Sequence, residues 1–128
     1  NPESIDAIIL THNHIDHTGL VPKAVKQGYR NKIYMTEITQ ELIGNFWRDS
    51  ANQQEENARE MRERYPDESH RFHALYHDED VEKTYKEILM KKTPEELFRM
   101  GVQKNIYINK RKPKEVIVDQ LMGKLLKS

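Results

Sequence analysis

The pattern of apolar and polar positions divides the chain into a short β-α-β beginning and a long helical remainder. Residues Ile5 to Leu10 form a nearly continuous apolar run, which is typical of a strand covered on both faces, most often in a parallel sheet. From Thr18 onward apolar residues recur at helical spacing as far as Gly28, a suitable C-terminal stop. Lys32 to Thr36 predicts a second short strand, and the order strand, helix, strand favours parallel pairing.

A long helix is predicted after the second strand. Thr36, or alternatively Thr39, can cap its N-terminus. Its first half carries an apolar stripe, which consists of Ile38, Leu42, Ile43, Phe46 and Trp47. The stripe thins after Ala51, and residues 53–64 are almost wholly polar. Such a stretch is typical of a solvated helix face or of an arm that extends from the core.

Two further helices are predicted beyond residue 77. Asp78 to Lys91 has apolar residues at helical spacing, and His77 stands where a capping residue would precede them. Thr93 introduces the next helix with a cap, a first-turn proline and an acidic first turn. We expect Gly101 to stop this helix at about Met100.

The last segment contains one strand-like stretch and one ambiguous stretch. Asn105 to Asn109 alternates around two isoleucines, as a strand would. Val116 to Val118 fits a strand, whereas Glu115 to Leu126 fits a helix with one apolar face, which consists of Val116, Ile117, Leu121 and Leu125. We favour the helix because Pro113 suits its beginning.

Composition limits the class of protein. The 128 residues match the size of one domain, and 21 basic against 21 acidic residues leave no net attraction to nucleic acid or membrane. Only 36% of residues are apolar against 33% charged, which favours long solvated helices. No apolar run approaches a membrane span. The absence of cysteine excludes disulfides and thiolate metal sites and fits a reducing compartment, so we expect a cytoplasmic protein.

The beginning of the sequence suggests a fragment. There is no initiator methionine, and Asn1-Pro2-Glu3-Ser4 leads almost directly into the first predicted strand. We interpret residues 1–128 as one α/β domain or a fragment of one. Residues 1–36 would form a β-α-β unit, and residues 37–128 a mostly helical segment.

A cluster of polar side chains follows the first predicted strand and suggests a metal site. His12, His14, Asp16 and His17 place three imidazoles and one carboxylate within six positions. These are ligand types that suit zinc and its neighbours in the first transition row. In an extended chain His12, His14 and Asp16 lie on one side, and His17 joins them if a helix begins there. The spacing therefore predicts a strand end, a ligand loop and a helix start. The alternative is a chance cluster of surface histidines.

The string His12-Asn13-His14-Ile15-Asp16-His17, entered from residues 5–11 and left through Thr18-Gly19, resembles the second sequence motif of the metallo-β-lactamase superfamily. The resemblance implies an α/β fold, here a partial αββα sandwich with a helix-rich C-terminal half. It implies that His12 and His14 bind one zinc ion and that Asp16 and His17 bind a second. A bridging hydroxide would then attack the substrate, with Asp16 as metal ligand and catalytic residue that orients the water. The family's remaining ligands lie well downstream of this motif, and the chain shows no matching histidine motif there.

A second resemblance extends over about residues 5–88. Its pieces are Gly28-Tyr29-Arg30, residues 33–36, Thr39, Leu42, Asp49-Ser50-Ala51, Glu55-Glu56 and residues 74–82. They look like the segment that follows the metal motif in the β-CASP branch, whose members are mostly RNA nucleases. The resemblance implies an RNA substrate as partner, with an oligomer left open. The alternative is that individual residues have ordinary structural roles. Asp49 is then a helix-surface residue, and Asp78 to Asp80 cap a helix.

Two other polar groups are interpreted as structural. His70, His73 and His77 have helical spacing, but Pro66 and the polar run after it predict a loop, so we assign these histidines to surface or capping roles. Lys110 to Lys114 is the one dense basic run, and it suits either RNA phosphates or, as we favour, a solvated turn.

The sequence therefore predicts a metal-dependent hydrolase, and most specifically a di-zinc phosphodiesterase or ribonuclease acting on RNA. One alternative is a hydrolase of the same superfamily that acts on thioesters or lactones. Another is a catalytically incomplete fragment with a structural or binding role, because four ligands shared by two ions leave each ion short of the usual three.

Overall fold

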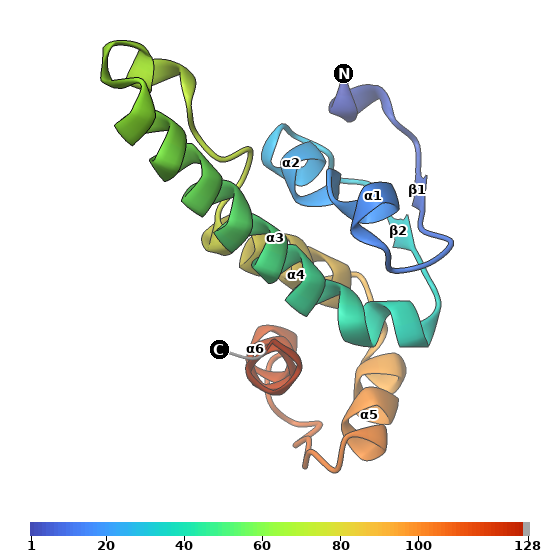
Figure 1. Ribbon diagram of the computed structural model, residues 1–128. Helices are drawn as coiled ribbons and strands as arrows, with labels where there is room; N and C mark the ends of the chain where they lie inside the picture. Colours follow the sequence, from blue (N-terminus) through green and yellow to red (C-terminus); the bar gives the residue numbers. More distant parts are fainter. Residues whose placement is uncertain (127–128) are drawn as a thin grey trace.

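A two-stranded parallel sheet organises the N-terminal part of the chain (Figure 1). In the computed structural model, which describes residues 1–126, strand β1 (Ile8–Ile9) pairs with strand β2 (Ile33–Tyr34), with Ile8 opposite Ile33. Helices α1 (Ile15–Thr18) and α2 (Val21–Lys26) connect them, and a short 3₁₀ helix, η1 (Pro2–Ser4), precedes β1. The predicted strand, helix, strand order with parallel pairing is confirmed.

Among the described residues the sheet is covered on one face only, whereas its apolar run predicted cover on both faces. Leu10 is buried and Ile8 packs against the core, whereas the side chain of Ile9 is 72% exposed. Tyr34, opposite Ile9, is 48% exposed. Side chains alternate between the two faces of a strand, and within residues 1–126 the helices pack against one face only. The apolar run therefore does not mark a strand buried on both sides.

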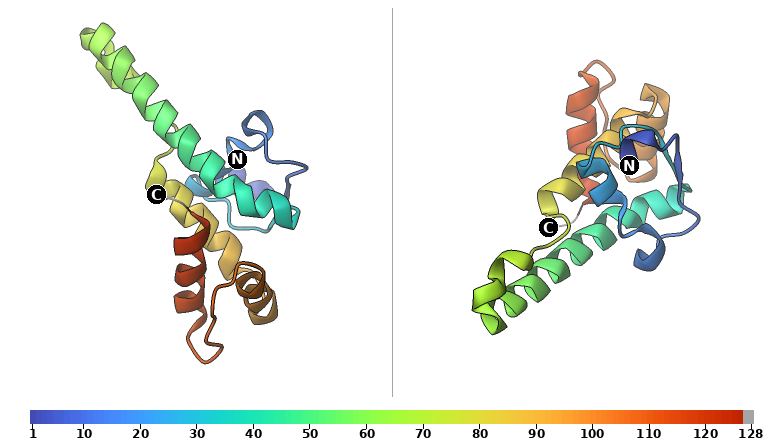
Figure 2. Two further views of the ribbon diagram at one scale, coloured as in Figure 1. Left: turned by 60° about the horizontal axis from the view of Figure 1, so that its bottom comes forward. Right: turned by 90° about the horizontal axis from the view of Figure 1, so that it is seen from above.

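Helix α3 (Glu37–Arg64) is the longest element and begins where predicted, with the Thr36 hydroxyl accepting a hydrogen bond from the Thr39 N–H at 3.2 Å. Its first half buries Ile43, Trp47 and Ala51. Its polar second half extends away from the other helices (Figure 2). The short 3₁₀ helix η2 (Pro66–Arg71) folds back beside it, where a loop was predicted.

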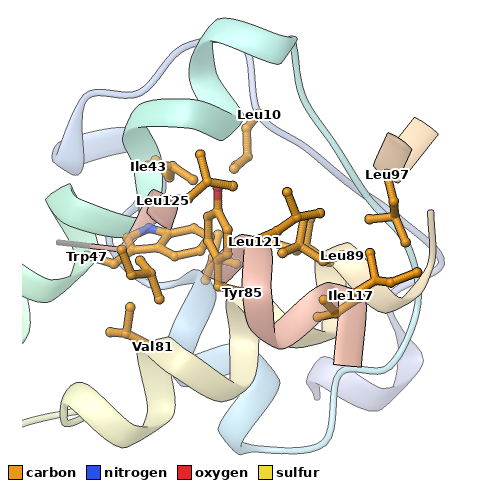
Figure 3. Close-up of a cluster of buried hydrophobic side chains, with 14 of the residues drawn as sticks. Leu10, Ile43, Trp47, Val81, Tyr85, Leu89, Leu97, Ile117, Leu121 and Leu125 are labelled. Carbon is orange, nitrogen blue, oxygen red and sulfur yellow. The ribbon is translucent and has the colours of Figure 1, made fainter. Parts of the chain in front are cut away.

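The core forms where helix α4 (Asp78–Met90) packs against α2, α3 and α6 (Lys114–Leu125). Helix α5 (Pro94–Gln103) contacts α6. Large side chains from these helices, together with Leu10 at the end of β1, pack against one another in the core (Figure 3). The helical ones include Ile43, Trp47, Val81, Tyr85, Leu89, Leu97, Ile117, Leu121 and Leu125. His77 caps α4 as predicted: its N–H donates to the Asp80 carboxylate at 2.8 Å.

Two predictions near the C-terminal end were wrong. Helix α5 does not stop at Gly101 but continues to Gln103, and Asn105 then turns the chain at φ 55°. Residues 105–109 form no strand, because the Ile106 N–H closes the helix end by donating to the Gly101 carbonyl at 2.8 Å. Glycine is needed at 101 for close packing: an added Cβ would lie 2.4 Å from Cγ1 of Ile108.

The last segment is helical, as favoured from the sequence, but its buried face differs slightly from the prediction. Ile117, Leu121 and Leu125 of α6 are buried as expected, while Val118 is fully buried and Val116 is 47% exposed.

The described residues support the α/β class only in its coarse form: one small sheet and a helix-rich remainder. The predicted αββα sandwich is not confirmed, since residues 1–126 contain one two-stranded sheet. Within the same residues, no helix is long and apolar enough to pass through a bilayer.

Candidate metal centre

The four predicted ligands lie together at the C-terminal end of β1. The Leu10 N–H still donates to the Tyr34 carbonyl at 2.8 Å, so the sheet ends immediately before the cluster. His12 and His14 lie in the loop that follows, and Asp16 and His17 belong to α1. The strand end, loop and helix start predicted from the spacing are therefore all present.

Helix α1 is short but firmly attached to the core. The Thr18 side chain is buried, and its hydroxyl donates to the His14 carbonyl at 3.1 Å. This hydrogen bond joins the last residue of α1 to the residue that precedes the helix. The Thr18 carbonyl accepts a buried hydrogen bond from the Trp47 indole at 3.0 Å. Pro22, four residues after Thr18, has no N–H to offer this carbonyl. Trp47 of α3 therefore supplies the donor that the local chain lacks. Sequence reasoning did not identify this anchor, although the threonine and the proline four residues apart could have indicated a need for it.

The imidazole ring of His12 lies beside the rings of both His14 and His17. His12 and His14 stand edge to face with ring centroids 4.9 Å apart, and His12 and His17 are 4.4 Å apart. Nε2 of His17 lies 3.4 Å from Oδ2 of Asp16, and both side chains are more than half exposed. The cluster thus faces solvent rather than the core.

Thr11 holds one of these rings. Its Oγ1 lies 2.9 Å from Nδ1 of His12. A metal-bound histidine usually donates its second ring N–H to a nearby acceptor, which fixes the ring and its tautomer. With Nδ1 of His12 engaged by Thr11, Nε2 is the nitrogen left for a ligand.

The donor set suits a zinc-type ion chemically, because imidazole nitrogen and carboxylate oxygen are both zinc ligands. Within residues 1–126, however, no three His, Asp or Glu side chains converge on one point that could hold an ion. The ring of His12 contacts the rings of His14 and His17 instead. Since the side chains are largely exposed, turning their nitrogens toward a shared ion would require rotation about side-chain bonds rather than repacking of the core.

The other polar residues singled out from the sequence lie elsewhere. His70 belongs to η2 and His77 to the N-terminus of α4. Asp78 pairs with Arg48, whose Nε and Nη2 donate to the two carboxylate oxygens at 2.7 and 2.8 Å. This pairing raises the pKa of Arg48 and joins α3 to α4. Asp49, on an exposed part of α3, lines the same surface hollow as Asp78.

Comparison with known proteins links the first two thirds of the chain to one family. The model described as "Metallo-beta-lactamase superfamily" matches residues 1–88. Ribonuclease TTHA0252 of Thermus thermophilus is 46% identical over 39 residues, which are 30% of this chain and 9% of that protein. Transcription termination factor FttA of Methanosarcina mazei is 51% identical over 39 residues, 30% of this chain and 6% of the factor. FttA of Lokiarchaeum sp. is 50% identical over 38 residues, with the same coverage of 30% and 6%.

The segments aligned with these relatives cover a small part of this chain and a smaller part of each relative. The aligned part of the chain spans less than a tenth of the length of each of these curated relatives. No solved structure matched the chain.

Proposed function

The chain belongs to the metallo-beta-lactamase superfamily, and from this premise we propose that it contributes the first metal ligands of a metal-dependent hydrolase that cleaves phosphodiester bonds in RNA. Membership confirms the family resemblance of the residues around His12, and the partial matches support the β-CASP branch. The names of the relatives, a ribonuclease and transcription termination factors, support RNA as the substrate class.

The observation that carries the proposal is the group of three imidazoles and one carboxylate at the end of β1. In this proposal His12 and His14 hold one zinc ion, and Asp16 and His17 hold a second. Bound divalent ions of this kind lower the pKa of a coordinated water and stabilise charge that develops on phosphoryl oxygens.

The chain's own residues have distinct tasks in this proposal. The histidines ligate through an unprotonated nitrogen, and Thr11 keeps Nδ1 of His12 engaged so that Nε2 is available. Asp16 is the catalytic residue, which both ligates and accepts a hydrogen bond from the attacking water to orient it. Trp47 positions Asp16 and His17 indirectly, through its hydrogen bond to the last residue of α1.

We propose a division of the chain that agrees with these contacts. Residues 1–36 form the unit that carries the ligands, and residues 37–128 form a mostly helical segment that supports it. The indole of Trp47 joins the two across the core, which supports the proposal of a single α/β domain or a fragment of one. Ligands beyond these four complete the two metal positions, because a catalytic zinc normally has about three protein ligands.

The test begins with metal binding by the 128-residue chain. Zinc would be titrated by calorimetry, and metal content would be measured by elemental analysis after dialysis. The double variant His12→Ala/His14→Ala should lose the bound metal. The control variant His70→Ala/His73→Ala removes two histidines away from β1 and should keep it. Equal retention by both variants would exclude the proposed ligands.

Substrate class is tested separately. The zinc-loaded chain would be incubated with an end-labelled single-stranded RNA and, in parallel, with a panel of thioesters and lactones. RNA cleavage that disappears in Asp16→Ala supports the proposal. Cleavage of the ester panel alone favours another hydrolase of the superfamily. Metal binding without any cleavage favours a fragment with a binding role.

A further inference from the structure

We propose that the α5–α6 loop (residues 104–113), with the first residue of α6, is a binding surface for single-stranded RNA, in which Arg111 and Lys112 contact phosphates and Tyr107 stacks on a base. The loop lies outside the residues that the family model matches. The proposal adds an interaction surface to the proposed function. Only the choice of RNA as the nucleic acid rests on that function.

The loop gathers cations that have no acidic partner among the residues that the structure describes. Lys110, Arg111 and Lys112 are exposed, and Lys114 is half-buried at the start of α6. Within residues 1–126 none of the four forms an ion pair, whereas Lys104 at the other end of the loop pairs with Glu41. Four positive charges within five positions, unpaired in the described part of the chain, attract phosphates.

The carboxylates nearest to this run in the sequence are already occupied. Nζ of Lys86, from α4, lies 2.7 Å from Oε1 of Glu115 and 3.5 Å from Oδ1 of Asp119. The hydrogen bond from Lys86 lowers the pKa of Glu115, which keeps that carboxylate charged and bound to α4. The acidic residues of α6 are therefore held by a cation from another helix, and the loop remains locally basic although the whole chain has no net charge.

Tyr107 offers a flat surface beside these charges. Its side chain is 82% exposed, the largest exposed fraction among the exposed large apolar side chains of residues 1–126. The neighbouring Ile108 is 5% exposed and belongs to the core cluster. Because the buried isoleucine anchors the loop, the tyrosine ring projects into solvent without the loop being loose.

The backbone of the loop is held by several hydrogen bonds. Nε2 of Gln120 donates to the Tyr107 carbonyl at 2.6 Å, and Oδ1 of Asn109 accepts from the Arg111 N–H at 3.0 Å. The ammonium of Lys110 lies 3.9 Å from the centre of the Phe98 ring. A surface that is ordered before binding loses less conformational entropy when the ligand arrives.

Single-stranded RNA fits these features better than other acidic partners. An exposed aromatic ring next to unpaired cations is the combination that binds bases and backbone together. An anionic membrane surface also attracts groups of roughly four to eight basic residues, but only a nucleic acid offers bases on which the exposed Tyr107 ring can stack. The loop also lies apart from the candidate metal centre in all three views (Figures 1 and 2), so RNA bound there would be held outside the site of cleavage.

The test measures binding without hydrolysis. Fluorescence anisotropy with a labelled oligouridylate would follow RNA binding by the 128-residue chain in the presence of a chelator, at several salt concentrations. Arg111→Ala/Lys112→Ala removes two phosphate contacts. Each contact on a single strand contributes a slope of about 0.7 to the dependence of log K on log salt. The variant should therefore bind ~25-fold more weakly at 0.1 M salt, with the slope reduced by about 1.4.

Matched variants separate the loop from general electrostatics. Lys83→Ala/Lys91→Ala removes two exposed cations, one in α4 and one directly after it, that form no ion pair within residues 1–126. It changes the net charge equally and should leave RNA affinity nearly unchanged. Tyr107→Ala should weaken binding at least about fivefold, whereas Tyr107→Phe should not. Zinc binding should be the same in all variants.

Several results would overturn the proposal: no RNA binding by the unaltered chain, equal losses in the two double variants, or tighter binding to phosphatidylserine vesicles or a polyglutamate peptide than to RNA. Because the assay contains a chelator, its outcome does not depend on whether the chain hydrolyses RNA. Failure of the loop and failure of the proposed hydrolase are thus distinguishable.

Discussion

Trp47→Phe should loosen the candidate metal centre from a distance. The substitution removes the indole donor 3.0 Å from the Thr18 carbonyl, at a tryptophan that is fully buried. Pro22 has no N–H with which to replace it. A buried carbonyl left without a partner costs about 1–3 kcal/mol, and the smaller ring adds a cavity term.

The magnitude can be measured by urea unfolding. With a typical slope of about 1–3 kcal/mol per molar urea, this loss lowers the unfolding midpoint by roughly 1 M. Because α1 carries two of the proposed ligands, zinc affinity should fall as well. Tyr85→Phe is the control: its hydroxyl, in the same core, donates at 2.6 Å to the Gln40 carbonyl, which belongs to α3 and not to α1. It should reduce stability and leave zinc affinity unchanged.

A second substitution tests the reason for the anchor. Pro22→Ala restores an N–H four residues after Thr18 and should recover part of the stability that Trp47→Phe removes. Unaltered stability in Trp47→Phe, or equal losses of zinc affinity in Trp47→Phe and Tyr85→Phe, would refute the role assigned to the indole.

Three further predictions concern single contacts. Thr11→Val should weaken zinc binding by about tenfold or more, because the proposed ligand His12 loses its hydrogen-bond partner. The urea midpoint should not change. An unchanged zinc affinity in calorimetry would contradict the role of Thr11. Gly101→Ala should lower the free energy of unfolding by about 1–3 kcal/mol, because the new Cβ lies 2.4 Å from Cγ1 of Ile108. Alanine is the better helix former, so a gain in stability would show that Ile108 moves aside at little cost. Hydrogen bonds from the Thr93 backbone N–H and hydroxyl lower the pKa of Glu96, so its contribution to stability is complete above the unfolded-state pKa of about 4.3 and is lost as pH falls through the lower folded-state pKa. The difference in unfolding free energy between the unaltered chain and Glu96→Gln should therefore shrink from pH 7 to pH 3.

Local patterns predicted most of the secondary structure, because they act through neighbours in the sequence. The Thr36 cap, the Thr93 capping box and the helical spacing after Asp78 each involve residues three or four positions apart. The same is true of the strand end and helix start around His14.

The errors arose where distant contacts decide the conformation. Alternation in residues 105–109 resembles a strand, but Ile108 packs against Gly101 and the helix end closes through Ile106. The apolar run before Leu10 resembles a fully covered strand, but exposure of Ile9 depends on which elements lie over the sheet. The hydrogen bond from Trp47 to Thr18 joins residues 29 positions apart. A contact over this distance produces no periodic pattern in the sequence. The ligand set itself was predicted from a compact motif, whose metal binding stays a prediction.

The polar half of α3 has a consequence for how the protein unfolds. At about 1.5 Å per residue a helix of 28 residues is roughly 42 Å long, and beyond Ala51 its buried side chains are reduced to Ala58 within the described residues. Arg59 bonds to Glu56 and Glu63 on the same helix, and Arg62 bonds to Glu55 and to the Phe72 carbonyl. Surface ion pairs of this kind contribute little and weaken with salt. The tip of α3 and η2 should therefore open as a separate cooperative unit, with amide protons that exchange faster than those around Trp47 and increasingly so at high ionic strength.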